Sequence, residues 1–292
     1  MSLSARTSRS MDPPLPLSGP AGESLPQVPS VDVLGTRVDA TSYEDAAGRI
    51  IEWAREGRSA SVCAAAVNNV MEAYDDPRFQ GVMRRADLVT PDGMPLVWAL
   101  RLLGVRTASR VAGTDLVPRV LRLAAASGTR VGFFGGTPEV LADLRSWAET
   151  LFPKLVVSFA QAPPFRPLSE EEEQRVVRDV TGSGTRILFV GLGCPKQEIW
   201  MDQVRGRVPA VMVGVGAAFD FLSGRKRRAP ILLQRVGLEW AFRLASEPQR
   251  LWRRYALHNP RFVVLFARQI LRDRLSRRGE RHARGPARKE RS

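Results

Sequence analysis

The chain has 292 residues, 44% of them hydrophobic and 25% charged, with a formal net charge of +14, and these values suit a folded globular protein with a sizeable core. Cys63 and Cys194 lie far apart without metal-ligand spacing, which excludes a disulfide framework and a cysteine-based zinc motif and indicates a reducing compartment. No stretch approaches the ~20 apolar residues of a membrane span, and the first residues lack the apolar centre of a signal peptide, so we expect a cytoplasmic protein.

The positive charge is concentrated near the C-terminus. Residues 225–292 contain 20 Lys or Arg against 5 Asp or Glu, whereas residues 1–224 contain 24 basic and 25 acidic residues. Residues 1–30 are rich in Pro, Ser and Gly and show little apolar clustering. We therefore expect three parts: a disordered segment over residues 1–30, an α/β domain over residues 31–224 and an arginine-rich helical segment over residues 225–292.

Helical and strand patterns alternate from residue 31 onward. The apolar spacing predicts helices over residues 42–56, about 69–85, from about 95, about 114–127, from 137, 168–180 and 195–205. Short apolar runs predict strands over residues 61–67, 87–90, 130–134, 155–159, 185–190 and 209–215. Ser42, Thr137 and Ser169 are suited to cap three of these helices. The alternation predicts a Rossmann-like α/β fold, in which a mostly parallel sheet has helices on both faces.

Two glycines follow the predicted strand "RVGFF". Gly135 and Gly136 allow close backbone approach, and Thr137 and Pro138 suit the start of a helix, so free amides there would face a bound phosphate. In a parallel sheet, ligands bind beyond the carboxyl ends of the strands. The same residues also fit an ordinary tight turn whose helix end is occupied by Glu139.

Two further loops after predicted strands combine glycine with polar side chains. "GLGCPKQE" and "GAAFDFLSG" lack the third glycine of the dinucleotide fingerprint, and the chain has no P-loop, which argues against a hydride-transfer enzyme. Lys196, Gln197, Glu198 and Asp220 each fit a cap or a surface position when taken alone. Taken together, the three loops predict a nucleotide or sugar-nucleotide pocket.

Asp92 lies in a Pro-Asp-Gly turn at the end of a predicted strand and before an apolar helix. A carboxylate at this edge of the sheet would project into the same pocket, partly shielded from water. There it could accept a proton from an attacking hydroxyl, the general-base role in displacement at a sugar carbon. Pro-Asp-Gly is also a common turn sequence, so a purely structural turn is the alternative.

The sequence "RFVVLFARQILRDRLSRR", residues 261–278, predicts a basic amphipathic helix. The apolar side chains expected near one helical face are Phe262, Leu265, Phe266, Ile270 and Leu271. Such a helix suits an anionic membrane surface, where each basic side chain near the headgroups contributes ~1 kcal/mol, or a groove on a partner. A last helix that packs on its own domain is the alternative.

Seven blocks carry a resemblance to a known family: "DLVTPDGMPLVWALRLLG", "RVAGTDL", "FFGGTPEVL", "PPFRPLSEEEE", "ILFVGLGCPKQEIWM", "VGVGAAFDFLSGRKRRAP" and "GLEWAFRLASEPQRLWRRY". In this order, over about residues 31–257, they resemble the WecG/TagA/CpsF family of bacterial glycosyltransferases, glycosyltransferase family 26. The resemblance implies inverting, metal-independent transfer of a sugar from a UDP-sugar to a polyprenyl-diphosphate-linked acceptor. The sugar implied is of the N-acetylmannosamine type, or another hexose or uronic acid. The implied location is peripheral, at the inner face of the plasma membrane, in cell-surface polysaccharide synthesis.

The resemblance also implies roles for individual residues. Asp92 matches the proposed general base, Arg110 and Gln197 match pocket residues near the reacting centre, and Asp220 matches a nucleotide-contacting residue. The arginines expected to bind substrate, including the diphosphate of the acceptor, are Arg228, Arg243, Arg250 and Arg253. A guanidinium suits this task because it stays charged and binds phosphate in a bidentate manner. We expect no metal and no cofactor, only UDP-sugar as the donor.

One position departs from the family pattern. Many relatives have an Asn in a Thr-x-Asn pattern after the first strand of the domain, where this chain has Ala66. Asn68 or Asn69 is expected to replace it in substrate binding. If neither does, either the substrate differs or the activity is reduced.

Two alternatives to an active transferase stay open. The basic segment fits a nucleic-acid-binding module, although it resembles no groove-reading motif and the family resemblance needs no such partner. Ala66 fits a family member with impaired activity. The partners we expect are UDP-sugar, a polyprenyl-diphosphate-linked sugar, an anionic membrane surface and a further copy of the chain in a homo-oligomer, and we expect no nucleic acid.

Overall fold

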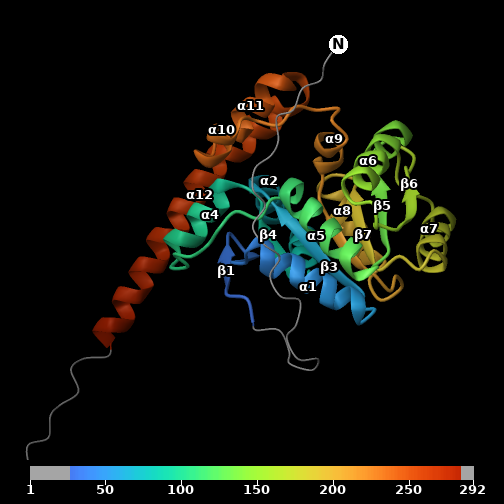
Figure 1. Ribbon diagram of the computed structural model, residues 1–292. Coiled ribbons are helices and arrows are strands. Elements are labelled where there is room, and N and C mark those ends of the chain that lie inside the picture. The colour runs from blue at the N-terminus through green and yellow to red at the C-terminus, as the bar shows by residue number, and fades with distance from the viewer. Residues whose placement is uncertain (1–26, 284–292) are drawn as a thin grey trace, which may run out of the picture.

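The centre of the protein is a parallel β-sheet. The computed structural model describes residues 27–283 and places six strands in the order β4-β3-β8-β7-β5-β6 (Figure 1). The strands are β3 (Ala60–Ala65), β4 (Leu88–Pro91), β5 (Val131–Gly135), β6 (Val157–Gln161), β7 (Ile187–Gly191) and β8 (Val211–Gly214). All neighbouring strands in this sheet pair in parallel. The predicted Rossmann-like α/β fold is confirmed.

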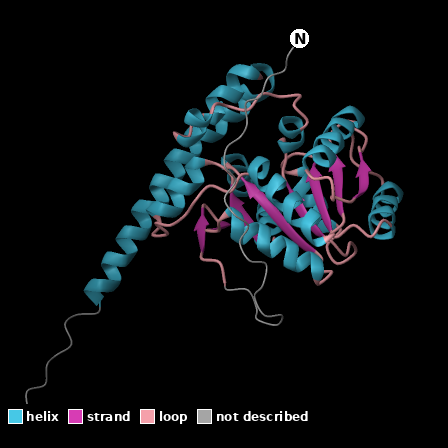
Figure 2. Ribbon diagram, in the orientation of Figure 1, coloured by secondary structure: helices cyan, strands magenta, loops and turns pink. Residues whose placement is uncertain are grey.

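Helices cover both faces of the sheet (Figure 2). The helices that pack in the core on one face are α1 (Tyr43–Arg55), α5 (Gly113–Ser127) and α6 (Pro138–Leu151). Those that pack in the core on the other face are α2 (Val67–Asp75), α3 (Pro77–Arg85), α4 (Met94–Leu102), α7 (Glu170–Gly182) and α8 (Lys196–Gln203). Successive strand residues point to opposite faces, so Phe133 belongs to the first core and Phe134 to the second.

The predicted N-caps are confirmed. The hydroxyls of Ser42, Thr137 and Ser169 each accept a hydrogen bond from the backbone N–H three residues further on. The carboxylate of Glu172 in turn accepts a hydrogen bond from the Ser169 N–H, which completes a capping box. These local sequence signals therefore fix the starts of α1, α6 and α7.

The segment predicted as one helix over about residues 69–85 forms two helices. α2 ends at Asp75 and α3 begins at Pro77, with Asp76 extended between them. Proline cannot donate a backbone hydrogen bond inside a helix but suits its first turn. The carboxylate of Asp76 accepts a hydrogen bond from the Arg78 N–H at 2.8 Å and caps α3.

A hairpin at the start of the domain was not predicted. β1 (Ser30–Val33) and β2 (Thr36–Asp39) pair antiparallel, and the turn residues Leu34 and Gly35 both have positive φ. Of the segment expected to be disordered, residues 1–26 lie outside the described residues, and Ser30 already begins β1. The strand expected over residues 155–159 lies two residues later, as β6.

The C-terminal segment is helical, as predicted. Its helices are α10 (Ile231–Arg235), α11 (Glu239–Ser246) and the 36-residue α12 (Pro248–Ala283), and the short α9 (Ala218–Leu222) precedes them at the end of the α/β domain. Figure 1 shows α12 running along the side of the domain, past α2 and α4. In the part of the chain that the structure describes, no helix combines the length and the apolar composition needed to cross a membrane.

One face of α12 packs on the domain. Phe262 and Phe266 are buried in the second core, and the Gln269 side chain accepts a hydrogen bond from the Leu34 N–H at 3.0 Å. Leu271 also lines the cleft, together with Phe262, but unlike that buried ring it is 60% exposed. The helix therefore has one apolar face on its own domain and exposed apolar side chains elsewhere.

Replacing Gly135 by Ala should destabilise the protein. Gly135 has φ +131, and an added Cβ would lie 2.5 Å from the backbone carbonyl of Gly191 on β7. Backbone strain of this kind costs about 1–3 kcal/mol before the clash is counted. Denaturant unfolding should therefore show a lower free energy of unfolding for G135A.

The matched control is G182A, at the end of α7. An added Cβ there has no atom within 4 Å, so the variant should gain stability by about 0.5–1 kcal/mol, as expected when Ala replaces Gly in a helix. Equal stability of G135A and the wild-type protein would contradict the importance of the contact between β5 and β7.

Candidate active site

A large cleft opens at the carboxyl ends of the strands. Its volume is about 1720 Å³, and its walls are the loops after β3 to β8 together with α10, α11 and α12. The predicted site residues that line it are Asn68, Asn69, Asp92, Arg110, Gly136, Gln197, Asp220, Arg243 and Arg250. Gly135, Arg228 and Arg253 are not part of its lining. Because parallel strands end at one edge, the cleft brings together residues that are far apart in the sequence.

Asp92 lines this cleft and is partly buried. Its backbone N–H donates to the carbonyl at the end of β3 at 2.8 Å, and its carboxylate side chain is 31% exposed. Burial raises the pKa of Asp92 to about 6, and the charge of Glu239 acts in the same direction, against Arg110 and Arg243. A carboxylate with this pKa suits proton transfer near neutral pH.

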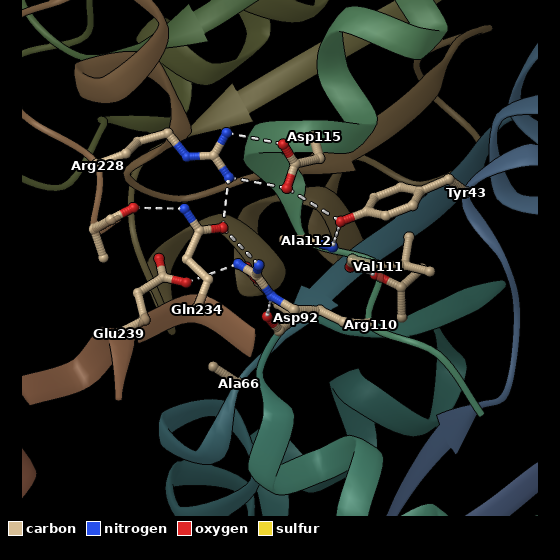
Figure 3. Close-up of polar contacts among 12 residues, drawn as sticks. Tyr43, Ala66, Asp92, Arg110, Val111, Ala112, Asp115, Arg228, Gln234 and Glu239 are labelled. Carbon is tan, nitrogen blue, oxygen red and sulfur yellow. Dashed lines mark hydrogen bonds and ion pairs between the residues drawn. The ribbon is translucent and has the colours of Figure 1, made fainter. Parts of the chain in front are cut away.

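Arg110 lies beside Asp92 without pairing closely with its carboxylate. The guanidinium donates to the backbone carbonyl of Asp92 at 2.9 Å, to Gln234 at 3.0 Å and to Glu239 at 2.8 Å (Figure 3). The distance from Nη2 to the Asp92 Oδ1 is 3.9 Å. The Arg110 guanidinium therefore makes its side-chain hydrogen bonds to the C-terminal segment.

Asn69 and Gln197 point inward, toward buried Glu198. The amide groups of both donate to Oε1 of Glu198, at 2.8 and 2.9 Å. Their amide oxygens accept the N–H groups of Ala66 and Gly216, at 3.1 and 3.0 Å. Burial raises the pKa of Glu198, which favours its protonated form. These side chains hold the loops after β3, β7 and β8 together at the base of the cleft.

Ala66, at the departure from the family pattern, lies on the wall of the cleft near Asp92 (Figure 3). Its methyl group makes no capping bond to α2. The neighbouring amides line the same cleft, where Asn69 bonds to Glu198 and Asn68 Oδ1 lies 3.2 Å from His258 Nδ1 of α12.

The two glycines at the end of β5 have different surroundings. Gly136 lines the cleft, whereas Gly135, the last residue of β5, packs against Gly191 of the neighbouring strand. Asp220, which also lines the cleft, forms an ion pair with Lys226 at 2.8 Å. Among the residues that the structure describes, no group of three or more His, Cys, Asp and Glu is arranged to hold a metal ion.

The predicted arginines divide into two groups. Arg243 and Arg250 line the cleft, and the Arg243 guanidinium lies 4.8 Å from the ring centre of Phe221. Arg228 instead forms two hydrogen bonds to Asp115, at 2.8 and 2.9 Å, outside the cleft. Its guanidinium also donates to Gln234, the residue that binds Arg110, so it contributes to the structure around Arg110.

Helix geometry explains which arginines of α12 face the cleft. Arg250, Arg254 and His258 are four residues apart, lie on one helix face and line the cleft, whereas Arg253 lies over the ring of Trp252, outside it. The Nε of Arg254 is buried and has no hydrogen-bond partner within residues 27–283. Arg254 and His258 were not predicted as site residues, although their spacing from Arg250 places all three on one helix face.

An aromatic residue at the rim of the cleft was also missed. Phe165, in the loop between β6 and α7, is 88% exposed although its loop lines the cleft. The adjacent Arg166 holds this loop through two hydrogen bonds to Glu172, each 2.7 Å long. The sequence signal was an aromatic residue between prolines, which marks a stiff exposed loop.

Comparison with known proteins agrees with this geometry. The model of the "Glycosyl transferase WecG/TagA/CpsF family" matches residues 31–276. The chain belongs to this family of glycosyltransferases. A relative from Bacillus spizizenii, "N-acetylglucosaminyldiphosphoundecaprenol N-acetyl-beta-D-mannosaminyltransferase", is 34% identical over 194 residues, which are 66% of this chain and 73% of the relative. The predicted resemblance is confirmed.

Replacing Asp92 by Asn should stabilise the folded protein at neutral pH. Folding raises the pKa of this carboxyl from 3.8 to about 6, so its ionisation disfavours the folded state as the pH rises through this interval. The gain in free energy of unfolding should reach at most about 3 kcal/mol above pH ~6 and vanish below pH ~4.

Paired thermal unfolding of D92N and the wild-type protein across this interval measures the effect. D143N, a surface substitution on α6, controls for the loss of one carboxylate. If the difference in free energy of unfolding between D92N and the wild-type protein did not vary with pH, Asp92 would titrate as an ordinary surface carboxyl group.

Proposed function

We propose that the protein is an inverting glycosyltransferase that transfers a sugar from a UDP-sugar to a polyprenyl-diphosphate-linked sugar without a bound metal ion. Family membership and the name of the Bacillus relative support this class of reaction and acceptor, and that name makes an N-acetylmannosamine type the first donor sugar to test. The observation that carries the mechanism is Asp92, a partly shielded carboxylate of raised pKa that lines the cleft.

The donor is proposed to lie along the strand ends. β4 and β5 are four positions apart in the sheet, which corresponds to ~19 Å and accommodates a nucleoside diphosphate sugar. In this orientation the sugar lies near Asp92 after β4. The diphosphate lies near the backbone of Gly136 after β5, and the base lies toward Asp220 and the exposed ring of Phe165.

The reaction is a single displacement. Asp92 accepts the proton of the acceptor hydroxyl while that oxygen forms a bond to the anomeric carbon of the donor sugar. The bond from this carbon to the UDP oxygen breaks on the opposite face, so the configuration inverts and UDP leaves with the electron pair. Arginines at the cleft, such as Arg243 and Arg254, offset the negative charge of the diphosphates.

The acceptor is proposed to reach the cleft from the inner surface of the plasma membrane, with the C-terminal segment lying on the bilayer. α12 carries an exposed stripe, defined here as Leu257, Val264, Leu271 and Leu275, of which Leu271 also borders the cleft. Its spacing of seven, seven and four residues follows one helix face. Apolar side chains mixed with arginines on one surface suit an anionic bilayer better than nucleic acid.

Replacing Asp92 by Asn should lower sugar transfer by about 10²–10⁴-fold, the usual contribution of a general base. UDP release is measured across UDP-sugars with a short-chain polyprenyl-diphosphate-sugar acceptor, and UDP binding is measured by calorimetry. Binding should be nearly unchanged, and D143N should behave as the wild-type protein. Unchanged turnover in D92N would remove Asp92 from this role.

Placing charges on the exposed stripe should release the protein from membranes. The double variant Val264→Asp and Leu275→Asp should no longer co-sediment with anionic phospholipid vesicles, because carboxylates on this face oppose both apolar contact and headgroup charge. Leu151→Asp, at an exposed position of α6, is the control and should still bind. Vesicle binding by the double variant at wild-type level would contradict this orientation.

A further inference from the structure

The C-terminal segment determines where the charge of Arg110 is placed. Nη2 of Arg110 lies 2.8 Å from Glu239 of α11 but 3.9 Å from Oδ1 of Asp92. Nη1 donates to Gln234 of α10 at 3.0 Å. The guanidinium lies within reach of two carboxylates and is bonded directly to the one that the C-terminal segment supplies.

A wider hydrogen-bond network fixes this arrangement (Figure 3). Gln234 Oε1 accepts from both Arg110 and Arg228, so it separates two like charges. Arg228 is bonded in turn to Asp115, which accepts a hydrogen bond from the Tyr43 hydroxyl at 3.2 Å.

The network closes on the loop that carries Arg110. The Tyr43 hydroxyl accepts the N–H of Ala112 at 3.1 Å, and the N–H of Val111 donates to the end of β4 at 2.9 Å. The backbone on the C-terminal side of Arg110 is therefore held, so a change of anionic partner has to come from its side chain.

We propose that Glu239 is a positioning residue, which holds Arg110 away from the Asp92 carboxylate and so keeps Asp92 able to accept a proton. This inference rests on the proposed function of Asp92 as general base. Without the charge of Glu239, Arg110 gains Asp92 as its nearest anionic partner. Arg110 already lowers the pKa of Asp92 from 3.9 Å, and because the attraction between opposite charges grows as their distance shortens, a closer approach lowers this pKa further.

Each charged group that faces Asp92 shifts the pKa of its carboxyl group in a known direction. Glu239 raises the pKa of Asp92, Arg110 and Arg243 lower it, and Tyr43 stays neutral because burial raises the pKa of its hydroxyl. Removing the charge of Glu239 therefore lowers the pKa of Asp92 in two ways: one repulsion disappears, and Arg110 is released toward it. A base of lower pKa is a weaker base at neutral pH.

Glu239→Gln tests the proposal directly, because it keeps a hydrogen-bond acceptor and removes the charge. The Asp92 carboxyl carbon is followed by NMR during a pH titration of the full-length protein with labelled aspartate, and D92N assigns its signal. The Asp92 pKa, about 6 in the wild-type protein, should fall measurably in E239Q, because Arg110 moves closer than its present 3.9 Å and the repulsion from Glu239 is lost. E239D, which restores the charge, should recover most of this shift.

E149Q, on α6, loses a surface carboxylate far from the cleft and should leave the titration unchanged. Thermal unfolding of each variant checks that it is folded. An Asp92 pKa in folded E239Q that equals or exceeds the wild-type value would overturn the proposal.

The pH profile of kcat/KM supplies a second readout. In E239Q the acid limb should move to lower pH by the amount that the titration shows, with little change in KM for the UDP-sugar. A merely structural role for Glu239 would lower activity without moving this limb. Absence of UDP release by the wild-type protein with every UDP-sugar would refute the proposed function, while the titration would still decide the role of Glu239.

Discussion

The proposed role of Asp92 depends on partly shielding its carboxylate from water without neutralising it. Burial disfavours the charge of Asp92, and Arg110 and Arg243 offset only part of this penalty. A close ion pair with Arg110 would satisfy the charge but leave a much weaker base. Arg110 is bonded to Glu239 instead, so the carboxyl group retains a pKa near neutrality. Such a group costs stability, which the rest of the fold must offset.

The parallel sheet supplies that stability and also gathers the site. β5 and β7 approach closely at their ends because Gly135 and Gly191 have no side chains there, and the ring of Phe219, which follows β8, packs against Gly191. The ring of Phe219 also packs edge-to-face against the ring of Phe133 in the core. One packing contact therefore sets the relative positions of three loops that line the cleft, far from Asp92 itself.

Sequence patterns that act over a few residues predicted most of the helices and strands. The features that were not predicted depend on contacts between residues far apart in the chain. Apolar periodicity and N-cap residues such as Ser169 act over three or four residues, so they can be recognised in the sequence alone. The inward orientation of Gln197 depends on Glu198 and on a backbone N–H that follows another strand. The bond from Arg110 to Glu239 joins residues 129 positions apart. Motif resemblance placed Arg110 at the site, but only the folded chain shows what holds it.

The two hypotheses for the C-terminal helix are compatible, because α12 has two apolar faces. Phe262 and Phe266 pack on the domain, which fixes the helix in place, while the stripe through Val264 and Leu275 stays exposed. A helix held in this way also constrains α10 and α11, which precede it in the chain. Those helices carry Gln234 and Glu239, the partners of Arg110. The surface proposed to meet the membrane and the residues beside the proposed base are therefore parts of one continuous segment, so the position of this segment also sets the charge environment of Asp92.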